Sequence, residues 1–218
     1  MNKETNVAQT TSKKALSFTD FLRVRFKGVL DGIGGFLNRL GIMPNTMTLL
    51  GLAGNTIAAG LLAWGHFLGG GIIILLMGPI DALDGTMARL RGQPTRFGAF
   101  VDSVTDRYSE LVIFGGLLVY YLRIQDWRAC GLLYLAAAGS VLVSYVKARA
   151  EGVGYKANVG ILTRAERFFV VVLGLLLNQM IIALWILAIL ANFTALQRIL
   201  HVRKQAYAQP AAKSTGNE

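Results

Sequence analysis

The sequence predicts an all-α integral membrane protein with six transmembrane helices and an N-terminal amphipathic helix beside the membrane. Its composition is 54% hydrophobic and only 16% charged, with a mean hydropathy of +0.50. Soluble domains carry about 25% charged residues. Long apolar runs follow one another along the chain, and basic residues gather between them. Together these observations favour membrane spans over a soluble fold.

The N-terminal region predicts a surface helix rather than a span. Residues 1–17 are polar and are expected to form a disordered tail, as are residues 206–218. Over residues 18–40, apolar side chains recur at helical spacing opposite a polar stripe, which is typical of a helix lying on the inner membrane face. Glycines at 32, 34 and 35 predict a break in it. Residues 41–205 are expected to form one six-helix domain.

Apolar runs long enough for membrane spans begin at residue 46, since a span needs about 20 residues. The last of them predicts either one long helix or two helices broken at Asn178 and Gln179. The runs are Thr46–Phe67, Gly70–Met87, Gly98–Leu122, Gly131–Val146 and Phe168–Leu196.

The distribution of basic residues favours the broken helix and therefore six spans. With six spans, all of the 22 Lys and Arg except Arg123 and Arg128 lie on one side. Basic residues stay in the cytoplasm, so both termini are expected there, in a multi-pass protein of the cell membrane. The fifth span must then begin near Thr163, because Phe168–Leu177 alone is too short.

The net charge of +10 predicts affinity for anionic lipids and for substrates that carry phosphate. Nucleic acid is the other usual partner of a basic protein. Here the charges are spread along a membrane edge, which argues against it.

Four aspartates lie at the inner ends of two predicted spans. Asp81 and Asp84 are three residues apart, and Asp102 and Asp106 are four apart, so each pair shares one face of a helix. Carboxylates so close to hydrocarbon are unfavourable unless cations neutralise them. Two helices that each present two carboxylates favour hard divalent ions such as Mg²⁺.

The residues around these aspartates resemble the CDP-alcohol phosphotransferase family. The pattern D-x2-D-G-x2-A-R-x8-G-x3-D-x3-D runs from Asp81 to Asp106. The resemblance implies that two Mg²⁺ ions, with Mn²⁺ as an alternative, bind Asp81, Asp84, Asp102 and Asp106. It also implies that Asp106, the last aspartate, is the general base.

The lipid nucleotide is expected beside the aspartates. Gly85 leaves room for a substrate, and Arg89 offers a planar fork of donors to a phosphate or a pyrimidine carbonyl. The Thr95 hydroxyl could contact a ribose or phosphate, or equally cap a turn. The family resemblance assigns part of the cytidine diphosphate contact to the start of the first span, at Pro44, Asn45, Thr46 and Thr48.

Other segments resemble phosphatidylinositol-phosphate synthases of the actinobacterial type. These segments are 144–151, 163–167 and 197–200, and the resemblance covers most of residues 20–205. It implies transfer from CDP-diacylglycerol to inositol phosphate, and also a homodimer. A phosphorylated acceptor requires cations, which three helices supply as Lys147, Arg149, Arg164, Arg167 and Arg198.

Three other functions remain open at this point. Glycerol 3-phosphate is also a phosphorylated alcohol, so phosphatidylglycerophosphate synthesis is the alternative within the family. Membrane prenyltransferases use acidic motifs and Mg²⁺, but they need more spans and lack the Asp84-Gly85-x-x-Ala88-Arg89 segment. A divalent-metal transporter would also use buried carboxylates.

Overall fold

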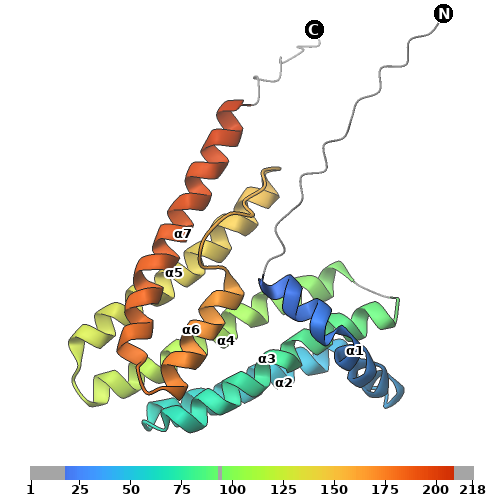
Figure 1. Cartoon of the computed structure of the whole chain (residues 1–218), viewed down its shortest axis with the longest axis horizontal. Helices are drawn as coiled ribbons and strands as arrows, with labels where there is room; N and C mark the ends of the chain where they lie inside the picture. The colour runs from blue at the N-terminus through green and yellow to red at the C-terminus, as the bar shows by residue number, and fades with distance from the viewer. Residues whose placement is uncertain (1–17, 93–94, 209–218) are drawn as a thin grey trace, which may run out of the picture.

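The computed structural model describes residues 18–92 and 95–208, with side chains from residue 27 onward, and contains only α-helices within them. The predicted N-terminal tail and residues 209–218 lie outside the described residues, whereas residues 206–208 belong to the last helix. In chain order (Figure 1) the helices are α1 Phe18–Arg39, α2 Pro44–Ala63, α3 Phe67–Leu90, α4 Arg96–Arg123, α5 Trp127–Gly152, α6 Arg164–Leu176 and α7 Met180–Ala208.

Helix boundaries follow local sequence signals. Pro44 occupies the first turn of α2, where its missing N–H removes no helical hydrogen bond. The Asp126 carboxylate caps α5 by accepting from the Ala129 amide at 3.0 Å. The last apolar run is broken, as the charge distribution predicts: α6 ends at Leu176, and Asn178 turns the chain with a φ of 54°.

Four helices are long and apolar enough to cross a membrane: α2, α3, α5 and α7. Helix α4 has 28 residues, but its first turns carry Asp102, Asp106 and Arg107. Helix α6 has 13 residues, which span about 20 Å at 1.5 Å rise per residue. The structure is therefore that of an all-α membrane protein.

Close packing between helices depends on small residues. Gly116 of α4 lies against the backbone of Ala59 in α2, where any side chain would collide with main-chain atoms. Helix α1 is continuous through its glycines, so the predicted break is wrong. Gly34 faces Thr86 of α3, and Asn38 donates to the Met87 carbonyl at 3.1 Å. Packing against α3 thus compensates for the low helix propensity of glycine.

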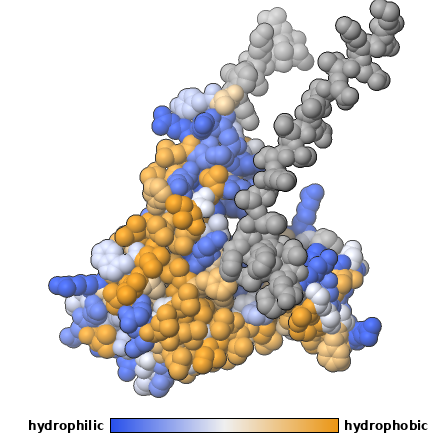
Figure 2. Space-filling model, viewed as in Figure 1, coloured by the Kyte–Doolittle hydropathy of each residue, from blue (hydrophilic) through white to orange (hydrophobic). Residues whose placement is uncertain are grey.

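The turns that join α2 to α3, α4 to α5 and α6 to α7 gather at one end of the molecule. Arg123 donates to the Ala63 carbonyl at 2.9 Å and lies over the Trp64 ring, while Asn178 lines a pocket with His66. The four aspartates lie toward the opposite ends of α3 and α4. Figure 2 shows that apolar residues cover much of the surface between these two ends, which fits contact with lipid.

Candidate active site

The site forms where the end of α3 meets the beginning of α4. The sequence places Asp81 and Asp84 in the last turns of α3, and Asp102 and Asp106 in the first turns of α4. Each of the four carboxylates lies within electrostatic range of at least two of the others and is repelled by them. Such a group requires positive charge nearby.

Thr48 connects the start of α2 to this group. Its hydroxyl donates to Asp84 Oδ2 at 2.6 Å, and the two residues expose only 5% and 6% of their surface. Asp84 Oδ1 also accepts from the Gly85 amide. These two donors fix the orientation of the carboxylate before any ligand binds.

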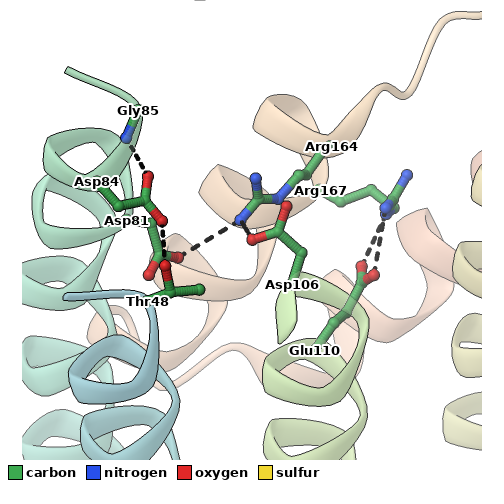
Figure 3. A network of polar contacts seen from close by, with 8 residues as sticks. All are labelled: Thr48, Asp81, Asp84, Gly85, Asp106, Glu110, Arg164 and Arg167. Atoms are coloured by element: carbon green, nitrogen blue, oxygen red, sulfur yellow. Dashed lines mark hydrogen bonds and ion pairs between the residues drawn. The ribbon is translucent and has the colours of Figure 1, made fainter. Parts of the chain in front are cut away.

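Arg164 supplies positive charge between the two helices. Its Nη2 atom donates to Asp106 Oδ1 and lies 3.4 Å from Asp81 Oδ2 (Figure 3). Arg164 is the first residue of α6, and half of its side chain is exposed, whereas Asp106 is buried. The guanidinium thus joins the end of α3 to the beginning of α4 from the beginning of a third helix.

Arg167, one turn further along α6, is fully buried and paired. Its Nε and Nη2 atoms donate to Glu110 at 2.8 and 3.2 Å. Both residues line a pocket together with Asp81, Asp106 and Arg164. This fork-to-fork pair holds α6 against α4 and thereby sets the position of Arg164. Direct phosphate binding by Arg167 would require the pair to open.

Gly51 is a site residue that sequence reasoning missed. It lies in α2, and a Cβ atom there would collide with Asp81 Oδ1. The carboxylate therefore rests against the α2 backbone. Gly51 stands in an ordinary apolar run beside other glycines, so its sequence context gives no sign of this role.

The remaining residues predicted for nucleotide binding differ in their environments. Arg89 bends back so that its Nη1 atom lies over Gly85, and its Nη2 atom donates to the Thr86 hydroxyl at 2.9 Å. Asn45 and Thr46 are exposed at the start of α2. The Thr95 hydroxyl accepts from the Gly98 amide at 2.9 Å, which is the capping role left open by the sequence.

The other predicted acceptor residues come from α5 and α7. Lys147 is partly exposed and lies 3.8 Å from Glu151, and Arg149 is exposed. Arg198 is buried and donates to the carbonyl oxygens of Val159 at 2.9 Å and Val143 at 2.6 Å. Arg198 and Arg167 are within electrostatic range. From α7, Arg198 therefore links the loop before α6 to helix α5.

The residues present fit a divalent cation. Within the described part of the chain, no three Asp, Glu, His or Cys side chains lie close enough together to hold a metal ion as they stand. Arg164 instead occupies the position between Asp81 and Asp106. All the donors are carboxylate oxygens, which Mg²⁺ and Mn²⁺ prefer, and the guanidinium shows that their shared position accepts positive charge.

Several known phosphatidylinositol phosphate synthases are similar to this chain over most of its length. The phosphatidylinositol phosphate synthase of Streptomyces avermitilis is 36% identical over 96% of this chain and 92% of its own length. The crystal structure of the Mycobacterium tuberculosis phosphatidylinositol phosphate synthase with CDP-DAG bound is 29% identical with a TM-score of 0.77, covering 87% of this chain and 99% of that one. Its complex with manganese and citrate is 30% identical with a TM-score of 0.76, covering 86% and 93%.

The family model for CDP-alcohol phosphatidyltransferases matches residues 41–197. This range includes α2 to α6 and most of α7, and with them all four aspartates and Arg164. The chain therefore belongs to the CDP-alcohol phosphatidyltransferase family and is an enzyme of that type.

Proposed function

We propose that this enzyme transfers the phosphatidyl group from CDP-diacylglycerol to a hydroxyl of inositol phosphate, giving phosphatidylinositol phosphate and CMP. The observation that carries the proposal is the position of Arg164, which reaches into the aspartate group from α6, the helix that also carries the buried Arg167. A nucleotide site that needs metal and a cationic site that needs an anion are therefore adjacent. The names of the relatives support the same substrates.

The proposed reaction exchanges one P–O bond for another. An acceptor hydroxyl oxygen forms a bond to the phosphorus that carries diacylglycerol, and the bond from that phosphorus to CMP breaks. Asp106 takes the hydroxyl proton. In this proposal Asp106 separates from Arg164 when substrates bind, which frees both the carboxylate and the guanidinium.

Asp81, Asp84 and Asp102 are proposed as the main metal ligands, with a contribution from Asp106. Two Mg²⁺ ions, or Mn²⁺ in their place, would supply positive charge beside the diphosphate of the lipid nucleotide. Pro44, Asn45, Thr46, Thr48, Gly85, Arg89 and Thr95 are proposed to surround the cytidine diphosphate part. Among these residues, Thr48 contacts the aspartates directly, through its hydrogen bond to Asp84.

We further propose six spans, with the aspartate end of the molecule in the cytoplasm. In this arrangement α4 and α6 cross with α2, α3, α5 and α7, and α1 lies on the inner face. The two basic residues near the opposite end, Arg123 and Arg128, would be the outer ones. The proposed homodimer would use open glycines such as Gly115, around which nothing lies within 4 Å. Replacing Gly115 with Leu should then yield a monomer in nanodiscs.

The acceptor is tested by a screen on the purified protein. CMP release is measured with CDP-diacylglycerol and Mg²⁺ in the presence of inositol phosphate, inositol or glycerol 3-phosphate. Inositol phosphate is expected to give the fastest release. Preference for glycerol 3-phosphate would overturn the acceptor and keep the family chemistry, whereas use of free inositol would remove the need for the cationic residues.

A further inference from the structure

Arg107 carries shielded donor groups that the described residues do not satisfy. It follows Asp106 in α4, and its charged neighbours are Asp106 and Glu110 on the same helix and Arg164 and Arg167 on α6. Its Nε and Nη1 atoms are shielded from solvent and make no hydrogen bond to the described residues. A guanidinium remains charged at all physiological pH values, so the unpaired donors cannot be relieved by proton loss.

The two acidic side chains near Arg107 are each paired with another arginine. Asp106 accepts from Arg164, and both oxygens of Glu110 accept from Arg167. In Arg198, Nε and Nη1 likewise donate to main-chain carbonyls. Among these four arginines, then, only Arg107 has shielded guanidinium nitrogens without an acceptor in the described structure.

An anionic ligand would relieve two unfavourable features at once. A buried donor without an acceptor costs about 1–3 kcal/mol, and more when it is charged. The positive charge of Arg107 is also repelled by the charges of Arg164 and Arg167. A phosphate group brings acceptor oxygens that match the guanidinium fork and negative charge that offsets the repulsion.

We propose that Arg107 binds the phosphate of the acceptor alcohol. This assignment rests on the proposed function and adds a residue from α4 to an acceptor site otherwise drawn from α5, α6 and α7. Because Arg107 is within electrostatic range of Asp106, a phosphate bound to it would lie near the carboxylate that takes the hydroxyl proton. Arg107 would thereby align the acceptor with the base, in addition to holding it.

The test compares Arg107→Ala, Arg107→Lys and wild-type enzyme in nanodiscs, with Arg128→Ala as the matched control. Arg128 is an exposed arginine near the other end of the molecule. CMP release is measured against inositol phosphate concentration at saturating CDP-diacylglycerol. Arg107→Ala should raise the KM for inositol phosphate about tenfold or more, as expected for loss of one charge-assisted hydrogen bond. Lysine keeps the charge and loses the fork, so Arg107→Lys should be intermediate.

Two further measurements separate phosphate binding from a structural role. The KM for CDP-diacylglycerol should stay within about twofold of wild type in Arg107→Ala, because a nucleotide contact is not being removed. Inositol phosphate should raise the unfolding temperature of the wild type and of Arg128→Ala by more than that of Arg107→Ala at the same concentration. If Arg107→Ala is too unstable to purify, Arg107→Gln removes the charge at similar volume and serves for the same comparison.

The outcomes also distinguish this inference from the acceptor assignment. An unchanged KM and an unchanged thermal shift in Arg107→Ala would overturn the role of Arg107. A wild-type enzyme that uses glycerol 3-phosphate instead would overturn inositol phosphate as acceptor. The same KM comparison with glycerol 3-phosphate would then decide the role of Arg107. A wild type that uses only unphosphorylated alcohols would overturn both.

Discussion

The guanidinium of Arg164 and the carboxylate of Asp106 form an ion pair between the beginning of α6 and the beginning of α4. The same nitrogen lies 3.4 Å from Asp81 in α3. A positively charged side chain therefore holds the position between two proposed metal-binding helices. Metal ions and Arg164 should compete for these carboxylates.

Removal of Arg164 should strengthen metal binding to the substrate-free protein. Arg164→Ala is expected to lower the dissociation constant for Mn²⁺ about tenfold, because a charge-assisted hydrogen bond contributes roughly 1.5–3 kcal/mol. Isothermal titration calorimetry without substrates measures the change. Arg128→Ala, a distant loss of the same charge, should bind Mn²⁺ as the wild type does. Equal or weaker Mn²⁺ binding by Arg164→Ala would show that the guanidinium does not compete.

The buried pair of Arg167 and Glu110 should contribute far more to stability than an exposed pair. Removing one partner of a buried pair leaves an uncompensated charge, so Arg167→Ala should reduce the free energy of unfolding by about 3 kcal/mol. The matched control is Glu151→Ala, which breaks the half-exposed contact with Lys147 at 3.8 Å and should cost less than about 1 kcal/mol. Unfolding in mild detergent compares the two variants, and similar losses would contradict a structural role for Arg167.

The aspartate group was predictable from the sequence, because helical periodicity alone puts each pair on one face. The break before α7 was predictable as well, from the placement of charge along the chain. The position of Arg164 was not, since it depends on how α6 packs against α3 and α4. Nor could the sequence show that Glu110 occupies the Arg167 fork, or that main-chain carbonyls engage Arg198. Those contacts join segments far apart in the chain.

The glycines illustrate the same limit of sequence reasoning. The low helix propensity of Gly34 predicts a break, yet α1 continues through it because α3 packs against the Gly34 face of the helix. Gly51 looked like any other glycine of an apolar run, yet it makes room for Asp81. Local propensity is a weak guide wherever tertiary packing decides the backbone environment.

Gly51→Ala should reduce activity without unfolding the protein. The added methyl group would collide with Asp81 Oδ1 and displace the carboxylate from its position against α2. We expect kcat to fall by about tenfold or more, as for a misplaced group in an active site. Gly60→Ala is the matched control, because it lies on the same helix with nothing within 4 Å. Equal activity of the two variants would show that the position of Asp81 is not critical.

The six-span proposal predicts which residues can be labelled from outside. After Cys130→Ser, single cysteines at positions 66 and 126 should react with an impermeant maleimide added to intact cells. Cysteines at positions 13 and 210 should react only after permeabilisation. Reaction of position 210 from the outside would support five spans and would place the C-terminus outside.

We propose that this enzyme joins a phosphatidyl group to inositol phosphate at the four aspartates. The most direct test is mass spectrometry of the lipid formed from CDP-diacylglycerol, inositol phosphate and Mg²⁺ by the wild type and by Asp106→Asn. The wild type should form phosphatidylinositol phosphate and CMP in equal amounts, and Asp106→Asn should form neither at a measurable rate while still inserting in the membrane. A lipid product without inositol phosphate would contradict the proposed acceptor, and a fully active Asp106→Asn enzyme would contradict the proposed role of the aspartates.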